Sequence, residues 1–186
     1  MNILIVNDDG INARGIEMLI RAAEPYGKIY VVAPKTQQSA VGQGITIHEP
    51  LQIDEEPDKF HNVQAWSISG KPADCVKVAM EYLRLDIDLV LSGINDGPNL
   101  GTDILYSGTV AGATEACIFR IPSIAISTDF ASWEIAEREI DGVLEFLIKG
   151  DYLQPGVIMN VNFQLQEHRQ SKGIRWTRQG YRIFSA

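Results

Sequence analysis

The sequence has few cysteines, a deficit of basic charge and no long apolar run. Its two cysteines among 186 residues, Cys75 and Cys117, match no metal-binding or redox spacing, so we expect both to be buried reduced thiols. Sixteen basic and twenty-four acidic side chains give a formal net charge of −8, which disfavours binding to a nucleic-acid polymer.

No stretch approaches the roughly 20 apolar residues that cross a bilayer, so no membrane association is expected. The chain opens with MNILIV and passes directly into two aspartates, without the basic start or cleavage site of a signal peptide. We therefore expect a cytoplasmic protein. The length predicts a single domain over residues 1–186, large enough to bury a core.

Apolar runs and amphipathic stretches alternate along most of the chain, which is typical of an α/β fold with a parallel sheet. The first unit is strand, helix, strand: a branched run, then apolar positions at helical spacing (Ile16, Leu19, Ile20, Ala23) closed by Pro25, then a second branched run. The pattern predicts strands at 2–7, 28–33, 89–91, 123–127 and 157–163, and further helices at 72–84, 109–119 and 132–147.

Residues 45–53 and 63–69 depart from this alternation. Ile45, Ile47, Leu51 and Ile53 alternate with polar residues, and an acidic turn at 54–59 separates the two segments. This pattern predicts a small antiparallel β-hairpin excursion beside the mostly parallel sheet.

Small polar and acidic residues follow three of the predicted strands, at 7–10, 37–39 and 92–95. Ligands of open parallel sheets bind beyond the carboxyl ends of the strands, so we expect these loops to share one rim. Asp8 and Asp9 are adjacent acids that raise each other's proton affinity unless a cation neutralises them. A divalent metal ion is the favoured explanation, and capping of the loop or of a helix start is the alternative.

Ser39 and Asn95 complete the candidate metal set, although each could instead belong to an ordinary turn. Two carboxylates, an amide carbonyl and a hydroxyl form an all-oxygen set, which favours magnesium or manganese over zinc. None of the histidines falls in these loops, so a histidine-based zinc site or catalytic triad is not expected.

The stretch 106–109 enters a predicted helix through small and hydroxyl residues, which leaves free N–H groups and the positive end of the helix dipole for an anion. Ordinary N-capping by Thr109 is the alternative. Ser107, Gly108 and Thr109 are thus candidate phosphate-binding residues, together with Asn95. Glu115 is either a buried partner for a loop amide or an exposed side chain, and the sequence leaves both open.

Four motifs together resemble the SurE family of survival-protein nucleotidases. They are NDDG at 7–10, QQS at 37–39, SGINDGPNLGTDILYSGTVAGATEA at 92–116 and NVNF at 160–163, in the order and spacing of that family. The resemblance implies a Rossmann-like, three-layer α/β fold. It also implies metal-dependent hydrolysis of nucleoside 5′- and 3′-monophosphates, in some members also release of phosphate from polyphosphate, with Asp8, Asp9, Ser39 and Asn95 as metal ligands.

Some features differ from the family pattern: Lys71, Gln43 and Gln164 replace the usual threonine, histidine and proline. The resemblance implies a homodimer or homotetramer. The chain stops at Ala186, where family members usually continue into an arm exchanged between subunits, so we expect much of this oligomerisation arm to be missing.

The leading hypothesis is a metal-dependent phosphomonoesterase acting as a 5′-nucleotidase, in which Asp8 or Asp9 is also the catalytic base. The alternative is a non-catalytic metal- and phosphate-binding regulatory module, like a signalling receiver domain. Such a module needs an acceptor aspartate and a lysine at later strand ends, whereas this rim offers Ser39 and Asn95, and no lysine follows the strand that ends near Ser127.

Overall fold

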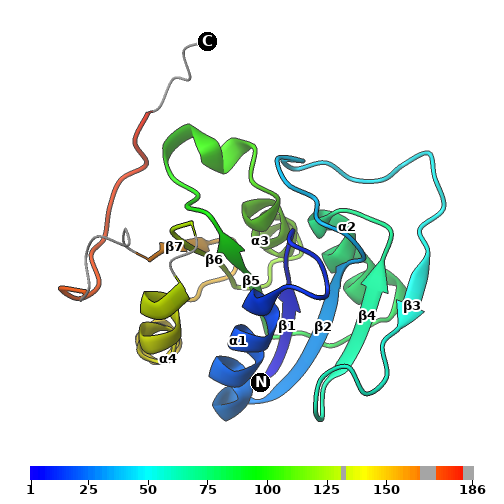
Figure 1. Ribbon diagram of the computed structural model, residues 1–186, viewed down its shortest axis with the longest axis horizontal. Coiled ribbons are helices and arrows are strands. Elements are labelled where there is room, and N and C mark those ends of the chain that lie inside the picture. Colours follow the sequence, from blue (N-terminus) through cyan, green and yellow to red (C-terminus); the bar gives the residue numbers. More distant parts are fainter. Residues whose placement is uncertain (131–132, 164–170, 182–186) are drawn as a thin grey trace.

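The computed structural model describes residues 1–130, 133–163 and 171–181. Within them, seven strands form one sheet in the order β3-β4-β2-β1-β5-β6-β7 (Figure 1). Neighbouring strands are parallel except β3 and β4, which are antiparallel. The strands are β1 (Asn2–Val6), β2 (Lys28–Pro34), β3 (Ile53–Glu55), β4 (Gln64–Ile68), β5 (Leu89–Asp96), β6 (Ser123–Thr128) and β7 (Ile158–Asn162).

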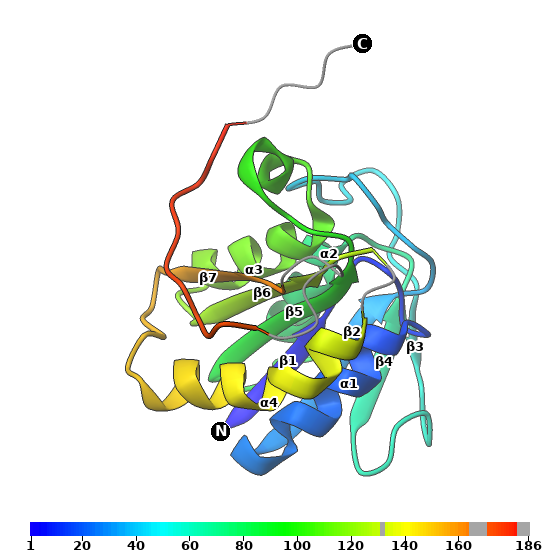
Figure 2. The ribbon, with the colours of Figure 1, turned by 60° about the vertical axis from the view of Figure 1, so that its left-hand side comes forward.

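Helices cover both faces of the sheet and make the fold three-layered (Figure 2). The longer helices are α1 (Arg14–Ala23), α2 (Pro72–Lys77), α3 (Gly108–Ile118) and α4 (Trp133–Lys149), and the short ones are η1 (Glu24–Tyr26), η2 (Val78–Tyr82) and η3 (Gly101–Leu105). Successive side chains of a strand point to opposite faces. Ile3 and Ile5 of β1 accordingly pack in the core under α1 and α4, while Leu4 and Val6 pack in the core under α2 and the end of α3. The predicted Rossmann-like α/β fold is confirmed.

The amphipathic pattern of the first helix is also confirmed. All four apolar positions that predicted it are buried on α1, and Pro25 lies in η1 directly after it. Gly15 lets this helix approach the sheet, because a Cβ there would overlap the backbone of Ile94. Within the described ranges, no helix is long and apolar enough to cross a membrane.

The antiparallel pair is confirmed, but its predicted first strand is wrong. Residues 45–51 lie in a loop, and β3 begins only at Ile53 and includes the acidic positions 54 and 55 that were assigned to the turn. The loop bonds to distant elements rather than to a strand: Thr46 donates from its backbone and hydroxyl to Asp74 at 3.0 and 2.7 Å, and the Gly42 N–H donates to the Tyr106 carbonyl at 2.9 Å. Ile45 and Ile47 are exposed, so the apolar alternation here does not mark the buried face of a strand.

Two further elements and the burial of one cysteine differ from the sequence prediction. β5 runs to Asp96, so the segment placed in a loop continues the strand with a shift of register between Ser92 and Asn95. The helix expected at 72–84 changes to a π-helix after Lys77. Cys75 is buried as expected, whereas Cys117 is only half-buried. Residue 132, where the last helix was expected to begin, and Gln164, which differs from the family pattern, lie outside the described residues.

Candidate active site

The two aspartates follow the central strand β1 in a tight turn that the preceding residue fixes. The buried side chain of Asn7 donates to the Gly10 carbonyl at 2.9 Å and accepts from the Gly10 N–H at 3.2 Å. Gly10 has a φ of +97°, which a side chain would strain. Asp8 and Asp9 are therefore held rigidly at the carboxyl edge of the sheet.

Asp8 lies against the first turn of α3. Asp8 is 5% exposed, and its Oδ1 accepts a hydrogen bond of 2.6 Å from the Thr109 hydroxyl. A Cβ at Gly108 would lie 2.7 Å from Asp8 Cβ, so only glycine permits this approach. Burial raises the pKa of Asp8 to about 6, with a smaller upward effect of Asp9, while hydrogen bonds from Thr109 lower it.

Asp9 points toward the other two loops. Its Oδ1 accepts from Gln37 Nε2 at 3.2 Å, and its Oδ2 accepts from the backbone N–H of Asp96 at 3.4 Å. Burial raises the pKa of Asp9 and the nearby charge of Asp96 adds to this, whereas the two hydrogen bonds oppose it. The ends of β1 and β5 and the loop after β2 thus meet at one rim.

Ser39 and Asn95 occupy this rim in different ways. The N–H of Gln38 donates to the Asp8 carbonyl at 2.6 Å, so the neighbour of Ser39 is bound to the aspartate turn while Ser39 itself is exposed. Asn95 is half-buried, and its Nδ2 donates to the Gly97 carbonyl at 2.6 Å. This bond fixes the amide and leaves its Oδ1 as an acceptor.

The N-cap of α3 is Ser107, so the alternative that Thr109 caps this helix is wrong. Ser107 Oγ accepts from the Val110 N–H at 3.1 Å, and Gly108 is the first helical residue. Ser92 Oγ donates to the Thr109 carbonyl at 2.6 Å and joins this turn to β5. Because residue 109 lies inside the first turn, its hydroxyl is free to bond Asp8 instead of the helix backbone.

Sequence reasoning missed an asparagine cluster behind the rim. Asn162 accepts from the Asn99 N–H at 2.8 Å and donates to the Asn99 carbonyl at 3.2 Å, while Asn160 donates to the same carbonyl at 2.9 Å. Asn99 Nδ2 donates to Ser127 Oγ at 2.8 Å. The NVNF motif contains the signal that could have found this cluster, because Asn160 and Asn162 are two apart and therefore lie on the same side of a strand. The cluster fixes the loop after β5.

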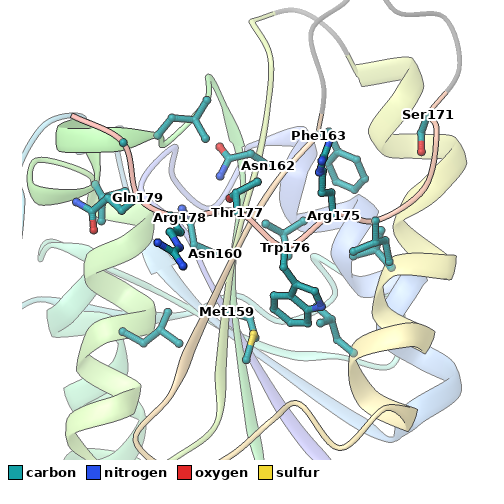
Figure 3. A pocket seen from close by; sticks show the side chains of 18 of the residues that line it. Met159, Asn160, Asn162, Phe163, Ser171, Arg175, Trp176, Thr177, Arg178 and Gln179 are labelled. Carbon is teal, nitrogen blue, oxygen red and sulfur yellow. The ribbon is translucent and has the colours of Figure 1, made fainter. Parts of the chain in front are cut away.

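A groove of about 690 Å³ lies on the other side of this loop, between α4, β7 and residues 173–180 (Figure 3). Met159 and Trp176 contribute apolar surface to it, and Gln179 ties the last segment to η3 by donating to the Gly101 carbonyl at 3.0 Å. None of the predicted site residues lines this groove, so it is separate from the aspartate rim.

The structure decides the open question about Glu115. Glu115 is 6% exposed and accepts from Gln43 Nε2 at 3.1 Å, with Lys77 Nζ 3.8 Å away. Burial raises the pKa of Glu115, and Lys77 and Gln43 oppose the rise. Glu115 is therefore the buried partner of a loop amide, and it anchors the loop that follows β2. Lys71 supports the same loop by donating to the Ile45 carbonyl at 3.2 Å.

The aspartate pair has the chemistry of a site for a hard divalent cation. In the described part of the chain, no basic side chain forms an ion pair with Asp8 or Asp9, so nothing there neutralises two adjacent, largely buried acids. No three His, Cys, Asp or Glu side chains of the same residues gather at a possible metal site. A metal set at this rim therefore needs neutral oxygen donors, which Ser39 and Asn95 offer.

The fold and the site are those of a Rossmann-like α/β protein with paired aspartates at the carboxyl edge of its sheet. The chain belongs to the survival protein SurE family, whose model matches residues 3–186. It is 46% identical over 180 residues to the 5′-nucleotidase SurE of Clostridium beijerinckii, which covers 94% of this chain and 71% of that protein.

Two further comparisons agree. The 5′-nucleotidase SurE of Clostridium botulinum strain Loch Maree is 44% identical over 191 residues, covering 100% of this chain and 75% of that protein. The crystal structure of the SurE protein from Aquifex aeolicus superposes with a TM-score of 0.79 at 40% identity, covering 98% of this chain and 73% of the other. Fold and family thus agree with the resemblance found in the motifs.

Proposed function

We propose that this protein is a divalent-metal-dependent phosphomonoesterase that hydrolyses nucleoside 5′-monophosphates to nucleoside and phosphate. The observation that carries the proposal is the position of Asp8 against the first turn of α3, with Asp9 next to it in the chain. This arrangement puts two carboxylates, which can hold a cation, beside a helix end that can bind an anion. The similarity to proteins named 5′-nucleotidase SurE supports nucleotidase activity. Hydrolysis of nucleoside 3′-monophosphates and of polyphosphate is part of the same proposal.

Asp8, Asp9, Ser39 and Asn95 would hold one Mg²⁺ or Mn²⁺ ion. When bound, the ion polarises the phosphate group and balances the charge of the two carboxylates. The raised pKa values of both aspartates fit this assignment, because a group that burial makes costly to ionise gains most from a nearby cation.

The residues at the start of α3 bind and orient the phosphate. The N–H groups of Gly108 and Thr109 and the hydroxyl of Ser107 lie at the positive end of the helix, where they can donate to phosphate oxygens. Thr109 also holds Asp8 in place through its hydroxyl. Asp8 or Asp9 takes a proton from the attacking water as the new P–O bond forms and the ester P–O bond breaks, and the leaving nucleoside oxygen takes up a proton.

The experiment is phosphate release from 5′- and 3′-nucleoside monophosphates and polyphosphate, with Mg²⁺ or Mn²⁺ and again after chelation. We expect metal-dependent release from the wild type and none from Asp8→Asn. Absence of release with either ion, from protein shown by circular dichroism to be folded, would contradict the proposal and favour a metal- and phosphate-binding regulatory module. Self-association as a dimer or tetramer, and a cytoplasmic location, stay predictions.

A further inference from the structure

An exposed aromatic ring lies on the strand end that carries Asn95. Phe130 is 68% exposed, and its ring packs against the backbone of Gly97. A Cβ at residue 97 would lie 2.6 Å from Phe130 Cε1 and 2.9 Å from Cζ, so any side chain there would displace the ring. Gly97 also has a φ of +139°. One side of the ring therefore contacts the backbone, while most of the ring stays open to solvent.

The backbone at Gly97 is bonded directly to the candidate metal site. The Gly97 carbonyl accepts from Asn95 Nδ2 at 2.6 Å, and the Gly97 N–H donates to the Thr128 carbonyl at 3.1 Å. Asp96, which lies between Asn95 and Gly97 in the sequence, donates its N–H to Asp9 Oδ2 at 3.4 Å. The ring therefore packs against Gly97, which is bonded to Asn95. Gly97 also follows Asp96, the residue that contacts Asp9.

A nucleotide whose phosphate is held at the aspartates extends its sugar and base away from them, and Phe130 lies on one side of this site. An exposed phenyl ring gains free energy when a nucleobase stacks on it, and such stacking tolerates any base because each has a π-face. A ring that the backbone already supports loses little freedom on stacking. Exposure, support and adjacency to the site thus coincide at Phe130.

We propose that Phe130 stacks on the base of the bound nucleoside monophosphate and selects nucleotides over phosphate esters that lack a base. This inference rests on the proposed function, because it needs a phosphate held at the aspartate rim. Phe130 acts on substrate affinity. It has no part in the proton transfers or in metal binding.

The test compares adenosine 5′-monophosphate with ribose 5-phosphate, which has the same phosphate and sugar but no base. For Phe130→Ala we expect kcat/KM toward the nucleotide to fall about tenfold or more, mainly through KM, with ribose 5-phosphate unchanged. Phe130→Trp should keep the preference. Tyr82→Ala, which removes a ring that is 70% exposed on η2, is the matched control and should change neither substrate.

Equal losses on both substrates, or no loss on either, would overturn the proposal. A selective loss in Tyr106→Ala instead would do the same and assign the base to that exposed ring. If the wild type hydrolyses neither substrate, calorimetric titration of adenosine 5′-monophosphate into the Mg²⁺-loaded protein separates the two proposals. Binding that weakens in Phe130→Ala then supports stacking without turnover, and absence of binding to the wild type refutes it.

Discussion

The Thr109 hydroxyl donates a 2.6 Å hydrogen bond to Asp8 Oδ1, joining the first turn of α3 to the end of β1 across 101 residues of chain. It is a buried, charge-assisted bond, and residue 109 is fully buried. This contact sets the orientation of the carboxylate relative to the helix end.

Replacing Thr109 by valine removes the donor and keeps the shape of the side chain. A hydrogen bond to a charged group contributes about 1.5–3 kcal/mol, so we expect kcat/KM to fall about 10- to 100-fold. Thr109→Ser keeps the hydroxyl and should retain most activity. Steady-state kinetics with adenosine 5′-monophosphate checks both variants, and equal activity of the valine and serine variants would show that the bond does not matter to the reaction.

Asp8→Asn should abolish activity and change how stability depends on pH. Because the pKa of Asp8 is raised from 3.8 to about 6 in the folded protein, the folded state retains this proton after the unfolded chain has lost it. Rising pH therefore destabilises the metal-free wild type by about 3 kcal/mol between about pH 4 and about pH 7, and the asparagine variant escapes this loss.

The measurement is urea unfolding of both proteins at a series of pH values in the presence of a chelator. We expect the free energy of unfolding of Asp8→Asn, relative to the wild type, to increase as the pH rises through this window. The difference between the two proteins cancels the titration of groups distant from residue 8, whereas Asp9, whose charge interacts with that of Asp8, still contributes to it. A constant difference would contradict the assigned burial of this carboxyl.

Gly108→Ala should damage the site because the added Cβ meets Asp8 at 2.7 Å. Overpacking of this kind costs about 1–3 kcal/mol, and displacement of the carboxylate should reduce activity by at least about tenfold. Gly142→Ala is the control: it lies in α4 with nothing within 4 Å of the new Cβ, and should stabilise the protein by up to about 1 kcal/mol. Thermal unfolding and kinetics distinguish the two, and a fully active Gly108→Ala would refute the close approach.

Divalent ions should stabilise the wild type but not variants of the aspartate pair. At a concentration about 100 times the dissociation constant, binding adds about 2.7 kcal/mol, which for a domain of this size raises Tm by about 5–10 °C. Chelation should reverse the rise. In Asp9→Asn we expect most of the shift to disappear, since one of two adjacent carboxylates is gone. An equal shift in the variant would place the ion elsewhere.

The local order of elements could be predicted where periodicity and tertiary environment agree. Ile16 and Leu19 predicted the buried face of α1 correctly, because residues three apart on a helix face one sheet. The alternation of Ile45 and Ile47 led to the wrong prediction of a strand. The same alternation occurs in a loop whose partners, Asp74 and Tyr106, are far along the chain. Hydrophobic alternation carries no information about such distant partners.

The site shows the same division. Asp8 and Asp9 were singled out as a candidate metal site because adjacent acids after a buried strand are costly unless a cation lies near. The roles of Asn160 and Asn162 were not, because their partner Asn99 is about 60 residues away and two amides on a strand look like ordinary polar positions. The alternative that Thr109 caps α3 was wrong by two residues, since Ser107 and Thr109 have equally suitable side chains.

The sequence by itself determined the fold class, the strand–helix–strand unit that begins with β1, and the loops that hold the acidic and hydroxyl residues. These depend on period and residue type, which are local properties of the chain. Only the tertiary structure decided that Thr109 bonds Asp8, that Gly108 admits the carboxylate, and that Phe130 lies on Gly97. Such contacts form between segments that are distant in sequence. They follow from how the helices pack against the strand ends and not from local residue patterns.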